Sequence, residues 1–276
     1  MLSLRLELSD GTDLQASSLP LRIPRASGVI DPEPFRHRAV HGPALAEAFA
    51  TSGGMRTLHL PDGMAAPALG LDEPLLTFVI SGELAAQTVN RGTVSLLPGD
   101  LFLTTQDAAW DAIMPNGDCR LVQVLVEPDW PGAKVRPVDH ASTHPRQNEP
   151  CNFKRMVRAP DEKSYFHAFP EIFGTPGAWS ATTPLVGFRF IGMAEDTFID
   201  WHPEIVNNLV LVLSGALELE VGGGAGRVQV FREGDICLAQ DKTGEGHIDR
   251  MHGFVHVAVL IVDDSELWPL TVPTEA

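Results

Sequence analysis

The sequence has few cysteines, and those it has follow no binding motif. Only Cys119, Cys151 and Cys237 occur, and no two of them form a C-x-x-C pair or another metal-binding spacing. Two of the three lie inside apolar runs, where a thiol behaves as a small hydrophobic side chain. The pattern favours structural cysteines over a zinc or redox site.

Long hydrophobic runs are also missing. No window reaches about 18 uninterrupted apolar residues, which is the length expected of a membrane-spanning helix. The N-terminal stretch MLSLRLELSD has no charged segment followed by a long apolar one, so it does not resemble an export signal. We therefore expect a cytoplasmic protein without a membrane partner.

Basic residues are in the minority, with 20 Lys and Arg against 36 Asp and Glu and a formal charge of −16. Such a surface repels nucleic acid, so no nucleic-acid partner is expected. A small anionic substrate in a locally neutral pocket remains compatible with it. The hydrophobic fraction of 44% is typical of a globular protein, and the length is sufficient for two ordinary domains.

Short runs of β-branched and aliphatic residues, separated by Gly, Pro, Asn and Asp, recur along the chain and predict many short strands joined by turns. Only residues 43–50 have the periodicity of a helix. The sequence therefore predicts an all-β protein with few short helices. The clearest expected strands are residues 75–80, 93–97, 121–126, 209–213, 227–231 and 254–262.

An internal repeat is the most informative feature. The segment LTFVISGEL matches VLVLSGAL, which aligns Gly82 with Gly215. Downstream, Pro-Gly-Asp at 98–100 matches Glu-Gly-Asp at 233–235, and the spacing of these landmarks changes by only a few residues. One supersecondary unit is therefore used twice, and each copy is expected to form an antiparallel sheet.

The two copies predict a chain of two domains. We expect an N-terminal domain at 1–135, a Pro-rich connection at 136–160, and a C-terminal domain at 161–276 that carries a polar pocket.

The repeated order of strand, Ser-Gly-x-Leu, hairpin, Gly-Asp turn and strand resembles the cupin superfamily. The likeness covers roughly residues 55–127 and 185–263, and the second copy is similar to small bacterial cupins with a WHP strand start and a TGxGH loop. It implies a bicupin of two tandem antiparallel jelly-roll (RmlC-like) β-barrels. Cupins commonly pair, so the resemblance also implies a homodimer.

The resemblance places metal-ligand positions at His202, Glu204 and His247, with Asn208 where cupins usually have a glutamate. Residues two apart on a strand share a face, so His202, Glu204 and Asn208 have the same parity. Two imidazoles and one carboxylate suit Fe, Mn, Zn or Ni with positions left open for a substrate. In the first copy, the positions that correspond to these ligands are leucines, namely Leu69, Leu71 and Leu75. The first copy is therefore predicted to have an apolar interior without a metal.

Two functions stay open. The first is an enzyme acting on a small organic molecule through a divalent metal, with His202, His247 and Asn208 as catalytic residues. Oxygenase, isomerase, cyclase and lyase chemistry all occur on such a fold. The second is a metal-free protein that binds or senses a small ligand, in which Glu204 faces solvent and the two histidines form hydrogen bonds in a polar pocket.

Overall fold

A computed structural model describes residues 4–5, 53–67, 75–88, 92–104, 110–126, 150–193 and 197–262. The helix expected at 43–50 and the leucines at 69 and 71 lie outside these residues. The described chain divides into two compact units. The first takes the described residues up to 126 together with 171–185, and the second takes 150–170 and 186–262.

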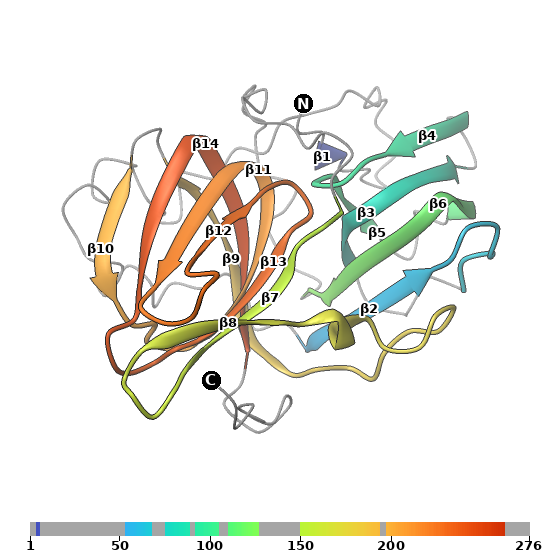
Figure 1. The fold of residues 1–276 in the computed structure, drawn as a ribbon. Coiled ribbons are helices and arrows are strands. Elements are labelled where there is room, and N and C mark those ends of the chain that lie inside the picture. The colour runs from blue at the N-terminus through green and yellow to red at the C-terminus, as the bar shows by residue number, and fades with distance from the viewer. Residues whose placement is uncertain are drawn as a thin grey trace. The chain divides into compact units, whose positions relative to one another are not determined.

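The first unit is built on a six-stranded sheet with the order β1-β5-β3-β6-β2, in which β4 pairs with β3 (Figure 1). All pairs are antiparallel except the short β1–β5 pair. The strands are β1 (Leu4–Arg5), β2 (Gly54–Leu60), β3 (Leu75–Thr88), β4 (Gly92–Leu96), β5 (Leu101–Thr104) and β6 (Trp110–Leu125).

The second unit is built on an eight-stranded sheet with the order β10-β14-β11-β13-β7-β8, in which β12 pairs with β11 and β9 with β14. A 3₁₀ helix at Pro170–Phe173 follows β8, where the chain passes from the second unit to the first. The strands are β7 (Phe153–Arg158), β8 (Ser164–Ala168), β9 (Leu185–Met193), β10 (Phe198–His202), β11 (Asn207–Val221), β12 (Val228–Phe231), β13 (Ile236–Gln240) and β14 (His247–Val262).

The segment between the repeats contributes to both units. Strand β7 falls in the expected connection, yet it pairs in parallel with β13 and belongs to the second sheet. Residues 171–185 return to the first unit, where the amide of Met55 donates to the carbonyl of Thr183 at 2.8 Å. The sequence is compatible with a strand from this connection in either sheet, and it does not decide which, because parallel pairing between distant segments leaves no local pattern.

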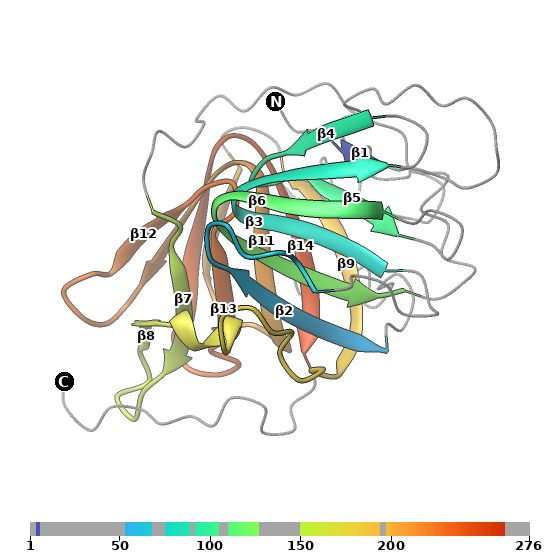
Figure 2. The same ribbon diagram turned by 90° about the vertical axis from the view of Figure 1, so that its right-hand side faces the viewer.

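The sequence repeat has a counterpart in backbone hydrogen bonds. The amide of Val79 donates to the carbonyl of Asp100 at 2.8 Å, and the amide of Val212 donates to that of Asp235 at 3.1 Å. Each aspartate also closes its own turn, because its Oδ2 accepts from the amide three residues earlier, at 2.8 Å for Asp100 and 2.6 Å for Asp235. The long paired strands of each copy, β3 with β6 and β11 with β14, can be followed in Figure 2.

The aligned glycines have the same role in the two copies. Gly82 and Gly215 both have positive φ, at 75° and 78°, and both lie where the register of a long strand shifts. A Cβ at Gly215 would collide with the carbonyl oxygen of Phe254 on β14. The bulge at Gly215 reverses the alternation of β11, so Val212 before it and Leu217 after it pack in the same core.

The core of the first unit contains buried polar side chains beside apolar ones such as Leu75, so the expectation of an apolar interior holds only in part. Thr77 and Gln123 are fully buried, on the strand faces that carry Val79 and Leu121 of the core. The guanidinium of Arg56 donates to Gln123 Oε1 at 2.7 Å, and Gln123 Nε2 donates to Thr77 at 3.1 Å. These side chains satisfy one another across three strands, as buried polar groups must.

Among the described residues, none of the helices has the length and apolar character needed to cross a membrane.

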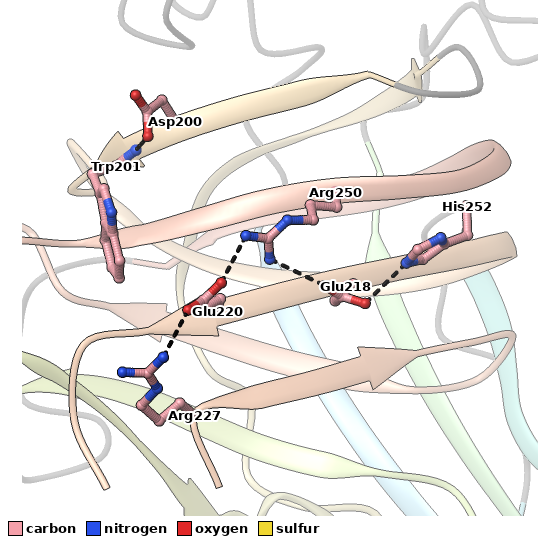
Figure 3. A network of polar contacts seen from close by, with 7 residues as sticks. All are labelled: Asp200, Trp201, Glu218, Glu220, Arg227, Arg250 and His252. Carbon is pink, nitrogen blue, oxygen red and sulfur yellow. Dashed lines mark hydrogen bonds and ion pairs between the residues drawn. The ribbon is translucent and has the colours of Figure 1, made fainter.

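On the outward face of the second unit, Arg250 of β14 joins two glutamates of β11 (Figure 3). It contacts Glu218 at 3.0 Å and Glu220 at 2.7 Å, and Glu220 also pairs with Arg227 at 3.2 Å. These side chains are in contact with solvent, and surface pairs of this kind contribute about 0–1 kcal/mol.

We expect Arg250→Ala to lower the free energy of unfolding by no more than about 1 kcal/mol per ion pair removed, and by less at high salt, because salt screens exposed charges. Urea unfolding at low and high ionic strength measures this, with Arg227→Ala as a control that removes only the pair to Glu220. A large loss that does not depend on salt would contradict it.

Candidate metal centre

Two of the predicted histidines lie side by side in the second unit. His202 ends β10, His247 begins β14, and the two are register partners across the antiparallel pair. Both are buried, with exposures of 5% and 2%, and their ring centroids are 4.4 Å apart. Gly246 permits this arrangement, because its φ is 77° and a Cβ there would collide with the carbonyl of His202.

The hydrogen bonds of the two imidazoles determine which nitrogen can bind a metal. Nδ1 of His202 lies 2.8 Å from the carbonyl oxygen of Asp200, which can only accept, so Nδ1 carries the proton. Nδ1 of His247 lies 2.9 Å from Asp241 Oδ2, which gives the same assignment when that carboxylate is ionised. In the neutral form of each ring, Nε2 therefore holds the lone pair that a metal ligand needs.

The third candidate ligand of this group is Asp249, which the sequence reasoning missed. His202, His247 and Asp249 each offer a ligand atom, and these atoms lie within 4.8 Å of one another. Asp249 Oδ1 is 3.3 Å from His247 Nε2 and is a buried atom that accepts no hydrogen bond. Two imidazoles and an orphaned carboxylate oxygen fit a divalent metal. Strand alternation was the signal that could have identified it, because Asp249 lies two residues beyond His247 and so points to the same face of the strand.

Glu204 and Asn208 adjoin this group. Asn208 Nδ2 donates to Glu204 Oε2 at 2.7 Å, and Glu204 Oε1 lies 3.9 Å from His247 Nε2. The Glu204 side chain is only 13% exposed, so it does not face solvent. Oδ1 of Asn208 is buried without a hydrogen-bond partner, which leaves a second unsatisfied oxygen in the site. The structure therefore brings together all four residues named from the sequence.

Burial and charge alter the pKa values in the site. Burial raises the pKa of Glu204 to about 7, although His247 and Arg189 oppose the shift. Burial would lower the pKa of His247, but Asp241, Asp249 and Glu204 outweigh it and raise that pKa to about 10. In the absence of metal, His247 is therefore a cation among carboxylates at neutral pH.

Arg189 is a further charged residue that the sequence reasoning missed. It lies on β9, 5% exposed, with the parity of the core residues Ile191 and Met193, so it faces the interior. Its charge favours the ionised form of Glu204. The other nearby side chains lie elsewhere: His252 is exposed beside Glu218, His256 is buried against Ser214, and Trp201 is 39% exposed.

No protein-family model matches the chain, and no curated protein is significantly similar to it in sequence. Among solved structures, it is similar to a cupin 2 conserved barrel domain protein from Leptotrichia buccalis, with a TM-score of 0.40, 10% identity, and 76% and 84% of the two chains covered.

Two further solved structures contain a metal. Bacterial pirin YhhW from Escherichia coli, in complex with nickel(II), gives a TM-score of 0.32 and 11% identity over 82% of this chain and 88% of that one. Oxalate decarboxylase from Bacillus subtilis, with Mn(II) centres, gives a TM-score of 0.30 and 12% identity over 77% of this chain and 70% of that one. The described residues of this chain are nearly all β-strand, with one 3₁₀ helix among them.

Proposed function

We propose that the chain is a bicupin whose second unit binds one divalent metal through His202, His247 and Asp249. The observation that carries this proposal is the geometry of that group: two imidazoles whose Nδ1 atoms are engaged elsewhere, and a buried Asp249 oxygen without a hydrogen-bond donor. This ligand set differs from the one suggested by the cupin resemblance, since Asp249 takes the place of Glu204.

The proposed activity is that of an enzyme acting on a small organic molecule. Fe, Mn, Zn or Ni bound here would supply Lewis-acid chemistry, which polarises a substrate oxygen or activates water. Glu204 would then act in proton transfer. Asn208 holds its Oε2, which leaves Oε1 on the side of His247, where a carboxylate can accept a proton from a bound molecule and return it. Asn208 thus keeps a role beside the reacting group without ligating the metal.

A binding or sensing protein without catalysis is the second candidate. The ion pair between His247 and Asp241, 2.9 Å long, gives the site an internal balance of charge that does not require a metal. In that case the polar group would bind a small ligand directly. The content of metal in the purified protein distinguishes the two functions.

The test is elemental analysis of tag-free protein purified without chelator. We expect stoichiometric metal in the wild type, strong loss in Asp249→Asn, and retention in Glu204→Gln, because only Asp249 belongs to the ligand group. If the wild type holds no metal, and added Fe, Mn, Zn or Ni does not raise its melting temperature, the metal proposal is wrong. Retention in Asp249→Asn with loss in Glu204→Gln would restore the ligand set expected from the resemblance.

The domain limits near 135 and 160, the homodimer and the cytoplasmic location stay predictions. Pairing of two copies would be compatible with the proposed site, because all of its ligands come from one chain.

A further inference from the structure

Asp241 is a fully buried carboxylate directly after β13, and it lies outside the ligand group. Its Oδ2 accepts a hydrogen bond from Ser164 Oγ at 2.8 Å and lies 2.9 Å from His247 Nδ1. An ionised carboxylate in the protein interior is strongly unfavourable unless it is paired and hydrogen-bonded. With these partners, the Asp241 carboxylate is in a position to hold the imidazole of His247 at its Nδ1 atom.

The partner of Asp241 is itself held by backbone contacts. Ser164 is the first residue of β8, is fully buried, and is the register partner of Arg158 on β7. Its carbonyl oxygen accepts from the amide of Gly223 at 3.1 Å. The β7–β8 hairpin, at the far edge of the sheet from β10, therefore fixes the backbone of Ser164, and its hydroxyl reaches Asp241 from there.

The two histidines of the proposed metal site differ in what holds their Nδ1 atoms. His202 donates to a neutral backbone carbonyl, whereas His247 faces a carboxylate. A carboxylate at Nδ1 fixes the tautomer and the ring orientation, and it makes Nε2 a stronger ligand. With Nδ1 held in this way, Nε2 of His247 lies on the side of Asp249, 3.3 Å from its Oδ1.

We propose that Asp241, oriented by Ser164, is a positioning residue that directs Nε2 of His247 toward the metal. This inference rests on the proposed function, because it requires a metal at that nitrogen. The proposal gives this aspartate a role in metal affinity.

The test measures zinc affinity by competition with a chromophoric chelator. We expect the zinc Kd to rise about 10- to 100-fold in Asp241→Asn, which keeps the size of the side chain and removes its charge. Ser164→Ala should give a smaller rise in the same direction. In ¹⁵N-histidine NMR of the zinc-loaded protein, the Nδ1 proton of His247 should be protected from exchange in the wild type and lose that protection in Asp241→Ala.

Two variants serve as matched controls. Asp235→Asn changes another buried aspartate, which closes a turn at the opposite end of β13, and Ser214→Ala breaks another buried contact between a serine and a histidine. Both should alter stability and leave the zinc Kd unchanged. They separate a loss of folding from a loss of ligand positioning.

Each outcome has a defined meaning. A wild type that binds zinc, with an unchanged Kd in both Asp241→Asn and Ser164→Ala, overturns the role of Asp241 and leaves the metal site in place. A wild type that binds neither zinc nor added Fe, Mn or Ni overturns the proposed function itself. If Asp241→Asn does not fold, the zinc Kd and NMR signal of Ser164→Ala decide the question.

Discussion

His247→Ala is expected to abolish metal binding and to destabilise the metal-free protein by roughly 3–5 kcal/mol, because it leaves buried carboxylates without their cationic partner. Asp241 and Asp249 both lie within 3.3 Å of this imidazole. Urea unfolding in the presence of chelator measures the effect. His252→Ala is the matched control, since it removes an exposed histidine five residues along the same strand, whose pair with Glu218 faces solvent.

The pH dependence of the metal-free protein should agree with this result. The pKa of His247 is raised from 6.5 to about 10, so its contribution to stability is fully present below pH 6.5 and is lost as the pH rises through 10. The pKa of Glu204 is raised from 4.5 to about 7, so ionising it also destabilises the fold as the pH rises through 7. Burial raises the pKa of Glu204 against the opposing charges of His247 and Arg189, whereas Asp241, Asp249 and Glu204 raise the pKa of His247 against its burial.

The free energy of unfolding of chelator-treated wild type should therefore fall between pH 6 and pH 10 relative to His247→Ala. Equal pH profiles for the two proteins would mean that His247 is not a buried cation. Equal stability of His247→Ala and His252→Ala would argue against the ion pairs around His247.

Gly246→Ala should have the second large effect, on both stability and metal content. Its φ of 77° is a left-handed conformation that costs an L residue of order 1–3 kcal/mol, and the added methyl group would collide with the backbone of His202 and Pro203. Neither backbone can yield as a flexible side chain would. The collision would separate His202 from His247, so we expect metal to be lost along with stability.

Gly63→Ala is the control for backbone strain alone, because Gly63 has a φ of 73° and open space around the position of a Cβ. The difference between the two variants in denaturant unfolding then reports the close approach at His202. A Gly246→Ala protein as stable as Gly63→Ala, with full metal content, would show that the loop before β14 can move away without disturbing the site.

The turns and repeated strands of this protein were accessible from the sequence because they depend on local features. Gly82 and Gly215 align in the sequence, and both adopt positive φ at a strand bulge. The Gly-Asp turns recur with the same hydrogen bonds in the two copies. Such features follow from the conformational freedom of glycine and from carboxylate capping of nearby amides, which need no distant partner.

The candidate site was accessible only in part. His202, Glu204, Asn208 and His247 were named from the cupin resemblance, and they lie together. The sequence did not show which of these residues belong to the ligand group and which only adjoin it. The distances between their side chains depend on the bulge in β10 and on the loop after it. To identify Asp249 as a site residue, one must know which face of the sheet His247 lies on, and strand alternation alone does not give that face.

The sequence by itself determined the alternation of strands, the two copies and the glycines that turn the chain, because each is encoded by neighbouring residues. Only the tertiary structure decided that β7 and β8 join β13, which brings Ser164 to Asp241, and that β9 places the charge of Arg189 near enough to Glu204 to influence its pKa. These contacts join residues far apart in the chain, and a buried charge gains its pKa and its partners only when the strands that carry it pack together.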